Sequence, residues 1–456
     1  QSLPIYREIK NPQGEADVLR RIDVLKQSLA IKDRKEEANF LKNLFIAYNN
    51  LGQYKKAISF LEKSLPIYQE LKDRKGEASV LGNLGLAYRH LGQYEEAINF
   101  YQQSLPIKQE LKDRKGEARA LSNLGSAYHS LGQYERAINF FQQSLTVSRE
   151  LKDREGEAIN LNNLGEAYKN LGQYKRAINF FQQSLPIFQE VKDRKEEAIT
   201  LDNLADAYGH LGQDERAINF YQQSLPIYQE LKDRKGEATV LNNLGFAYGH
   251  LGQYERAINF YQQSLPIYQE LKDRKGEANV LNNLGTAYDN LGQHKRAINF
   301  FQQSLPIYQE LKDRKGEATV LNNLGFAYGH LGQYERAINF YQQSLPIYQE
   351  LKDRKGEANV LNNLGFAYRH LGQYERAINF YQQSLPIYQE LKDRQGEADV
   401  LNNLGFAYRH LGQYERAINF YQQSLPIYQE LKDRQGEADV LYGLCHAYKS
   451  QEQSKK

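Results

Sequence analysis

Histidine is the residue whose spacing in this sequence most clearly suggests chemistry. Six histidines share one position of a repeating pattern: His90, His210, His250, His330, His370 and His410. Imidazole is a common metal-binding side chain, so such a series could form a row of metal ligands. Equivalent helices of neighbouring repeats, however, pack at least about 8–10 Å apart, which is too far for their side chains to share one ion. We therefore expect surface histidines that were copied with the repeat, and no metal site.

Motifs for nucleotide chemistry or covalent catalysis do not occur in the sequence. It contains no GxxxxGK[ST] or GxGxxG phosphate loop and no HExxH zinc motif. Cys445 and His446 are neighbours in sequence, which does not make them a nucleophile–base pair. We therefore expect a protein that is not an enzyme and that uses no cofactor.

Charge and hydropathy limit the classes of partner. The 456 residues carry 59 basic and 56 acidic side chains, a net charge of +3, and the two signs mix within each repeat. Because no basic stripe can follow a phosphate backbone, we expect no nucleic-acid partner. No apolar run reaches the roughly 18 residues of a membrane span, so we expect no membrane association.

The single cysteine and the N-terminal residue bear on where the chain belongs. One cysteine, Cys445, allows no disulfide within the chain and fits a reducing compartment, so we expect a cytoplasmic protein. The sequence begins at Gln1 and contains no methionine, and we interpret it as a fragment of a longer protein.

A period of 40 residues organises the sequence. One alanine recurs at every step from Ala38 to Ala438, and Leu241–Val280 is identical to Leu321–Val360. We expect three regions: a degenerate N-terminal capping repeat over residues 1–37, ten repeats over residues 38–437, and a half-repeat helix with a polar tail over residues 438–456. Such a pattern predicts a stack in which each repeat packs on its neighbours.

The spacing of apolar and small residues predicts two helices in each repeat. In the sixth repeat the first helix is expected over Ala238–Gly252, with a tight turn at Gly252, and the second is expected to begin near Tyr254. Asp273 is the expected N-cap of the following first helix. The expected buried stripe of the second helix is Ala257, Tyr261, Ser264, Leu265, Tyr268 and Leu271.

Proline falls inside the expected second helix of nine repeats, as at Pro266. The apolar pattern continues through Pro266 without a change of phase, so we expect this residue to kink the helix rather than end it. Thr146 takes the place of proline in the helix that begins near Tyr134. We expect that helix to be straighter than its neighbours.

The repeat resembles the tetratricopeptide repeat (TPR) family in Leu241, Leu244, Gly245, Tyr248, Ala257, Tyr261 and Ser264. Its length of 40 residues, against about 34 in the usual repeat, is similar to the repeats of kinesin light chain, the Pins/LGN adaptors and cyanobacterial TPR arrays. The resemblance implies an all-α fold, a right-handed superhelical α-solenoid of antiparallel helix pairs whose first helices line a concave groove. It also implies a non-catalytic scaffold that binds a protein or peptide segment in that groove.

Asparagine fills one expected groove position in every repeat. A carboxamide donates and accepts hydrogen bonds, so a row of carboxamides can pair with an extended peptide backbone of any sequence. The alternative is that these amides bond within the stack. The expected peptide-binding asparagines are Asn83, Asn123, Asn163, Asn203, Asn243, Asn283, Asn323, Asn363 and Asn403, with Asn242, Asn282, Asn322 and Asn362 beside them.

Other expected groove positions change along the chain. Repeats four and five carry an acidic stretch of Glu166, Asp202 and Asp206. Later repeats carry aromatic and basic residues that we expect to bind a peptide: Phe246, Phe326, Phe366, Phe406, His250, His330, Arg369 and Arg409. We expect the phenylalanines, next to small residues such as Gly249, to form pockets for apolar side chains of the ligand. The alternative for the phenylalanines is packing against the neighbouring helix.

Two other functions remain open at the level of sequence. The array could be the sensor or self-association arm of a larger signalling protein, with an NTPase or protease-like effector outside this fragment. It could also be a helical-repeat RNA reader resembling the pentatricopeptide family, although electrically neutral repeats and an unvarying asparagine disfavour that function. The favoured partner is a protein or peptide segment in the groove, with self-association as the second option.

Overall fold

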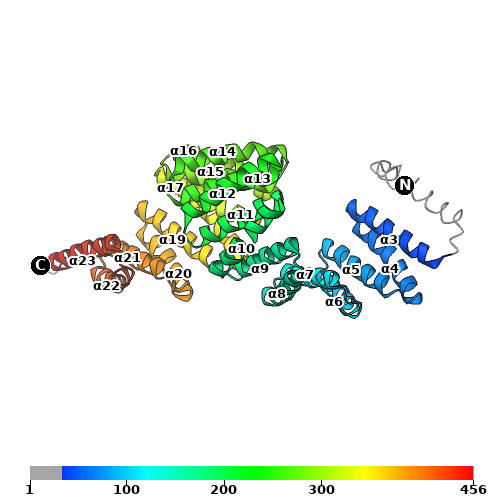
Figure 1. Ribbon diagram of the computed structural model, residues 1–456. Coiled ribbons are helices and arrows are strands. Elements are labelled where there is room, and N and C mark those ends of the chain that lie inside the picture. The colour runs from blue at the N-terminus through cyan, green and yellow to red at the C-terminus, as the bar shows by residue number, and fades with distance from the viewer. Residues whose placement is uncertain (1–32, 455–456) are drawn as a thin grey trace. The chain divides into compact units, whose positions relative to one another are not determined.

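A computed structural model describes residues 33–454 of the chain (Figure 1). Its contacts divide the chain into two compact units, which meet between Ile227 and Tyr228. Over the described residues, 21 α-helices follow one another, and no strand occurs among them. The expected all-α repeat fold is therefore confirmed. The expected capping repeat falls largely on residues 1–32, outside the described part of the chain.

The first unit contains regular helices of 17 or 18 residues. Their bounds are α3 (Arg34–Asn50), α4 (Tyr54–Glu70), α5 (Arg74–His90), α6 (Tyr94–Glu110), α7 (Arg114–Ser130), α8 (Tyr134–Glu150), α9 (Arg154–Asn170), α10 (Tyr174–Val191) and α11 (Arg194–His210). The next helix, α12 (Asp214–Glu230), contains the division between the units.

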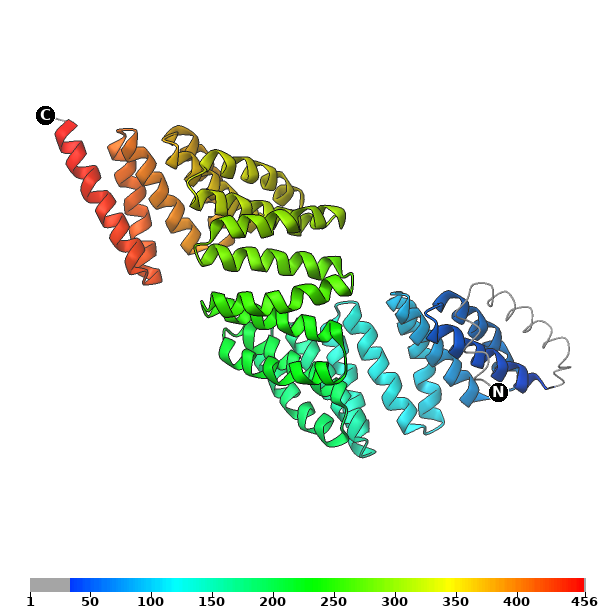
Figure 2. The same ribbon diagram turned by 90° about the horizontal axis from the view of Figure 1, so that it is seen from above.

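The second unit continues the same pattern and ends on a longer helix. Its helices are α13 (Arg234–His250), α14 (Tyr254–Glu270), α15 (Arg274–Asn290), α16 (His294–Glu310), α17 (Arg314–His330), α18 (Tyr334–Glu350), α19 (Arg354–His370), α20 (Tyr374–Leu391), α21 (Arg394–His410), α22 (Tyr414–Leu431) and α23 (Arg434–Ser454). Consecutive helices of this unit pack side by side, as the orange and red helices near the C-terminus show in Figure 2. The last helix, α23, packs on α22 and α21, and its Tyr442 stays 66% exposed.

The first helices of successive repeats also contact one another directly. In the second unit these contacts join α13 to α15, α15 to α17, α17 to α19 and α19 to α21. We call the surface that these five helices share the A row of the second unit, and the matching surface of α3, α5, α7, α9 and α11 the A row of the first unit. Side chains on an A row can therefore reach from one repeat to the next.

Two kinds of turn join the helices. The turn inside a repeat has Gly252 at φ +70°, a left-handed conformation that glycine adopts without strain. The turn between repeats has Lys272 at φ +53°, and the next residue, Asp273, donates its N–H to the Tyr268 carbonyl oxygen at 2.9 Å. Both turns end a helix by satisfying its last carbonyl groups. Asp273 then accepts the Gly276 N–H at 2.9 Å, which confirms it as an N-cap.

Close packing of small residues against rings forms the core. Gly245 lies so near Tyr261 that an added Cβ would approach the ring to 2.5 Å. The start of the second helix at Tyr254 and the position of Pro266 inside it are confirmed. Two other expectations were wrong. The first helix spans Arg234–His250 and not the expected Ala238–Gly252, because Asp233 caps it just as Asp273 caps the next first helix. Leu271 is 40% exposed at the end of its helix, where the buried stripe has already stopped.

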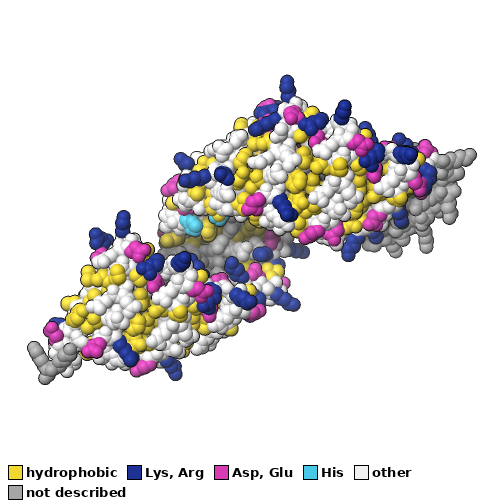
Figure 3. All heavy atoms as spheres, turned by 90° about the horizontal axis from the view of Figure 1, so that it is seen from below, with side chains coloured by type: hydrophobic (Ala, Val, Ile, Leu, Met, Phe, Trp, Pro, Cys, Tyr) yellow, Lys and Arg dark blue, Asp and Glu magenta, His cyan; other side chains and the backbone are white. Residues whose placement is uncertain are grey.

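Charged side chains are interspersed over the surface. On the face seen in Figure 3, neither basic nor acidic residues gather into a continuous stripe. Part of this mixing comes from ion pairs between repeats, such as Arg274 Nη2 with Glu310 Oε2 at 3.2 Å. Among the helices of residues 33–454, none combines the length and apolar character that crossing a lipid bilayer requires.

Candidate functional site

A pocket of about 500 Å³ lies on the A row of the second unit, between α17, α18 and α19. Five of the expected binding residues line it together: Phe326, His330, Asn362, Asn363 and Phe366. Its remaining walls come from Gly329, Tyr334, Ala337, Tyr341, Ala367 and His370. The structure therefore brings part of the expected site into one cavity, although the other expected residues lie outside it.

The phenylalanines of the A row are exposed rather than buried between helices. Phe246 is 52% exposed, Phe326 46% and Phe366 41%, whereas Phe406 is half-buried. Each of these rings contacts the histidine one turn later on its own helix, as Phe326 does with His330 at a centroid separation of 4.3 Å. An exposed aromatic ring with a fixed neighbour is a preformed surface for an apolar group.

Gly329 keeps the pocket open. A Cβ added there would have no heavy atom within 4 Å, so the space beside this helical residue is unfilled. On the next first helix the matching residue is Arg369, whose guanidinium lies 4.6 Å from the Phe366 ring centroid and 4.7 Å from that of Phe406. Glycine at this position, as at Gly329, therefore leaves a pocket between neighbouring phenylalanine rings. Arginine, as at Arg369, places a guanidinium between them.

Arg369 also orders the polar edge of the A row. Its Nη1 donates to Asn403 Oδ1 at 2.9 Å. Burial, followed by the charge of Arg369, holds the pKa of His370 below its usual value. The pKa of His410 is lowered in the same way, by burial and then by Arg409 and Arg369. Both imidazoles are therefore neutral at physiological pH and can donate or accept a hydrogen bond.

The asparagine row forms hydrogen bonds within the second unit. Asn363 Nδ2 donates to Asn322 Oδ1 at 3.2 Å. The same bond joins Asn283 to Asn242, Asn323 to Asn282 and Asn403 to Asn362, at 3.1, 3.1 and 3.4 Å. Each of these bonds uses one of the two N–H groups of the donating amide, so the second N–H group is not used in it. The carbonyl oxygen of the donating amide takes no part in this bond, although that of Asn403 accepts from Arg369.

The A row of the first unit has a different chemistry. Lys169 Nζ contacts Asp206 Oδ2 at 2.8 Å and Asn203 Oδ1 at 2.9 Å. Asn203 Nδ2 in turn donates to Glu166 Oε1 at 3.1 Å. The expected acidic stretch is thus tied to a lysine and an amide of the same surface. The other expected asparagines of this unit, Asn83, Asn123 and Asn163, are half-buried on α5, α7 and α9.

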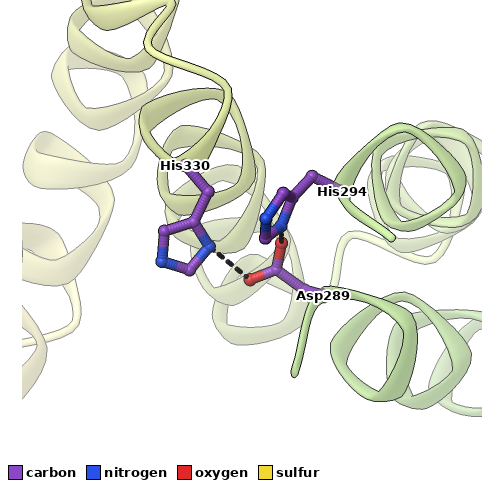
Figure 4. A group of neighbouring side chains, drawn as sticks. All are labelled: Asp289, His294 and His330. Atoms are coloured by element: carbon purple, nitrogen blue, oxygen red, sulfur yellow. Dashed lines mark hydrogen bonds and ion pairs between the residues drawn. The ribbon is translucent and has the colours of Figure 1, made fainter. Parts of the chain in front are cut away.

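The sequence analysis missed two sets of residues. Tyr334 and Tyr341 of α18 close one side of the pocket. Tyr334 begins α18 and stacks on His370 of α19 at 4.7 Å, a contact between helices that the repeat position of neither residue predicts. Asp289, His294 and His330 also converge, with candidate ligand atoms all within 4.8 Å of one another (Figure 4). The search for metal ligands compared histidines at one repeat position and overlooked Asp289 and His294, which depart from the repeat.

Comparisons with known proteins place the repeats in a family. The family model described as tetratricopeptide repeat matches residues 36–110, 116–190, 156–230, 236–310, 316–390 and 396–456. No curated protein matches the chain in sequence.

Several solved structures resemble the chain in fold. One is a signal-transduction ATPase of the STAND class with a tetratricopeptide repeat sensor, from Pyrococcus horikoshii, at 15% identity and a TM-score of 0.58, over 76% of this chain and 54% of the other. Another is the apo form of the quorum sensor NprR from B. thuringiensis, at 16% identity and a TM-score of 0.53, over 79% of this chain and 99% of the other. At these identities the likeness concerns the fold.

Proposed function

The chain belongs to the tetratricopeptide repeat family, and from this premise we propose that it is a non-catalytic scaffold that holds a protein or peptide segment on the A row of its second unit. The observation that supports this proposal is the pocket between α17 and α19, whose volume of about 500 Å³ lies in the range of ligand-binding pockets. Exposed Phe326 and Phe366 give that pocket two rigid aromatic walls.

Backbone recognition would come from the asparagines. Asn363 uses one N–H on Asn322 and retains hydrogen-bonding groups at the pocket wall. An extended segment could accept from this amide and donate to its carbonyl oxygen, whatever its side chains are. The bonds within the stack then serve to orient the amides, because they fix each carboxamide plane before a ligand arrives.

Arg369 suggests a preference in the ligand. Its guanidinium lies between the rings of Phe366 and Phe406, beside the pocket, and donates one hydrogen bond to Asn403. A guanidinium has five N–H groups, so further donors remain for a carboxylate. We therefore propose a segment with an apolar side chain in the pocket and an acidic residue next to it.

A selection from a random peptide library, followed by affinity measurements on the full chain, tests the proposal. Phe326→Ala with Phe366→Ala should weaken the selected peptides at least tenfold, because both aromatic walls are lost. The matched control is Leu351→Ala, which removes an equally exposed apolar side chain outside the pocket, 40% against 41% for Phe366. Photo-crosslinking from Asn243, Asn283 and Asn323 should reach the same peptides. Crosslinks confined to the second helices would contradict the proposal.

Self-association is the second candidate function, and a repeated apolar position supports it. In nearly every repeat a leucine that is 39–42% exposed stands at or directly after the last residue of the second helix: Leu71, Leu111, Leu151, Leu231, Leu271, Leu311, Leu351, Leu391 and Leu431. A regular row of this kind could pair with a second copy of the chain. Sedimentation at increasing protein concentration, with Leu271→Ser and Leu311→Ser, distinguishes this function from peptide binding. A chain that stays monomeric at all concentrations would exclude self-association as a function.

A further inference from the structure

The seventh repeat departs from the others at two positions five residues apart. The first residue of the second helix is tyrosine in most repeats, as at Tyr334, but it is His294 here. The residue one position before the end of the first helix is Asp289, whereas the repeats on either side have Gly249 and Gly329. No other repeat has aspartate at that position, so a carboxylate and an imidazole enter the same turn together.

The usual residues at this junction stack ring against ring, and where the first helix carries Arg369 or Arg409 its guanidinium is the polar neighbour of the histidine. Tyr334 lies flat against His370, with ring centroids 4.7 Å apart and planes 11° apart. Tyr374 and His410 repeat the arrangement at 4.9 Å and 13°. Histidine at the end of a first helix is therefore normally covered by the preceding tyrosine ring.

At the seventh repeat three polar groups replace that stack. The rings of His294 and His330 are 4.6 Å apart but tilted by 50°, and Asp289 lies between them (Figure 4). Asp289 Oδ1 is 2.7 Å from His294 Nδ1, and Asp289 Oδ2 is 3.2 Å from His330 Nδ1. These side chains come from the end of α15, the start of α16 and the end of α17.

The geometry points to a metal site: we propose that Asp289, His294 and His330 bind a divalent first-row transition metal such as Zn²⁺. Zinc lies about 2.0–2.2 Å from nitrogen and oxygen ligands, so two ligands of one tetrahedral ion are about 3.4 Å apart. The observed separation of 3.2 Å between Asp289 and His330 is close to that value, and the 2.7 Å between Asp289 and His294 is shorter, as a hydrogen bond is. Small side-chain rotations suffice to exchange the hydrogen bonds for metal bonds.

The chemistry of the surroundings supports a cation. Asp289 is 8% exposed, so its carboxylate is held in place and poorly solvated, and a bound cation would compensate its charge. The nearby Arg296 is directed elsewhere, with Nη1 on Gln293 Oε1 at 2.9 Å and its guanidinium over the Tyr288 ring. Two imidazoles and one carboxylate favour Zn²⁺, Ni²⁺, Cu²⁺ or Co²⁺ over the harder Mg²⁺ and Ca²⁺.

Three protein ligands leave at least one position on the metal open. His330 also lines the pocket of the A row, so an open position on its side could take water or a donor atom from a bound segment. The site nevertheless stands on residues of this chain alone and does not depend on peptide binding.

Titration of the metal-free full chain with Zn²⁺ against a competing chelator tests this site. The background variant Cys445→Ser removes the exposed cysteine next to His446 as a second source of binding. We expect one equivalent of Zn²⁺, weakened at least tenfold by His294→Tyr and by Asp289→Gly. Both substitutions install residues that other repeats carry at the same positions, so the helices should remain intact, as circular dichroism would show. With Co²⁺, visible ligand-field bands should appear and should be lost in both variants.

His370→Ala is the matched control, because His370 has the repeat position of His330 but lies next to Tyr334 in place of His294. It should leave the Zn²⁺ affinity unchanged. Two outcomes overturn the proposal: an affinity that His294→Tyr does not change, or an equal loss in His370→Ala. The first outcome would mean that Asp289 and its histidines form a hydrogen-bonded cluster only. Because no peptide enters the experiment, neither outcome bears on the proposed scaffold function.

Discussion

The A rows of the two units use the same backbone positions for opposite purposes. In the first unit, Lys169 and Asp206 form an ion pair across neighbouring first helices, at 2.8 Å. In the second unit the residues at these two positions are Gly329 and Phe366, and a pocket lies there. The helix pairs are therefore the same in both units. The residues at these two positions determine whether the surface is polar and closed or apolar and open.

Importing the polar pair into the second unit should have the largest effect. Gly329→Lys with Phe366→Asp reproduces the pair of Lys169 and Asp206. The new lysine should fill the pocket and the lost ring should remove one wall, so peptides selected on the native chain should bind at least 100-fold more weakly, about 2.8 kcal/mol. Fluorescence anisotropy measures the affinity.

Leu351→Asp is the control for that exchange, since it places a charge at an exposed leucine outside the pocket. It should change the affinity little. If the double variant keeps native affinity, the pocket is not the binding surface, and the contrast between the two A rows has no bearing on ligands.

Packing behind the A rows allows a second test. Gly325 faces Tyr341, and an added Cβ would lie 2.5 Å from the ring, so Gly325→Ala should destabilise the second unit by about 2 kcal/mol in urea unfolding. In the first unit one repeat carries a fully buried alanine at this position, Ala205, while three carry glycine. On the same helix, Gly329→Ala should instead stabilise by about 0.5–1 kcal/mol, because the space there is unfilled. An equal change in the free energy of unfolding for the two substitutions would show that the Tyr341 ring moves aside at little cost.

Alkaline pH should destabilise the second unit more than the first, by a smaller amount than the substitutions above. The second unit has tyrosine at the position of Tyr308 in each repeat, whereas the first unit has one tyrosine there, Tyr68, and then Lys108, Ser148 and Phe188. Burial, followed by Asp313, raises the pKa of Tyr308 to about 12, above the value of about 10 in an unfolded chain. A raised pKa favours the protonated phenol in the folded state. This contribution is complete below about pH 10 and is lost as the pH rises toward 12.

Brief proteolysis at pH 8 and pH 11, with fragments identified by mass spectrometry, checks this difference. Cleavage should increase more in the second unit, and absorbance at 295 nm should report the phenols as they ionise. Equal loss of protection in both units would contradict the assignment of the effect to these tyrosines.

The sequence predicted the helix pairs well because the constraint is repeated ten times. Asp273 was identified as an N-cap and Pro266 as a helix residue from phase alone, and both are confirmed. Leu271 was misassigned because the apolar period continues to the end of the second helix, while the neighbouring repeat does not cover that end. Periodicity gives the face of a helix but not how far a neighbour extends along it.

The candidate site was predictable on one helix and not between helices. Exposed phenylalanines on the A row followed from their repeat position, whereas Tyr334 and Tyr341 enter the pocket from α18. Asp289, His294 and His330 lie at three different repeat positions, so comparing equivalent residues could not bring them together. The sequence did contain a signal for this cluster, because Asp289 and His294 both depart from the repeat within one turn. Whether the asparagines and phenylalanines bind a ligand stays a prediction.

The smallest expected effect concerns α8, which lies in the first unit and lacks the proline of the other second helices. Thr146 donates its hydroxyl to the Gln142 carbonyl oxygen at 3.0 Å. In α14, Pro266 supplies no N–H to the matching carbonyl of Gln262.

Thr146→Pro should lose one backbone hydrogen bond, about 1 kcal/mol, and should regain a similar amount because proline restricts the unfolded chain. Stability should therefore change by less than about 1 kcal/mol, while α8 should acquire the bend expected of α14. Crystal structures of both forms measure the helix axes. An α8 that is already as bent as α14 would show that proline does not shape either unit.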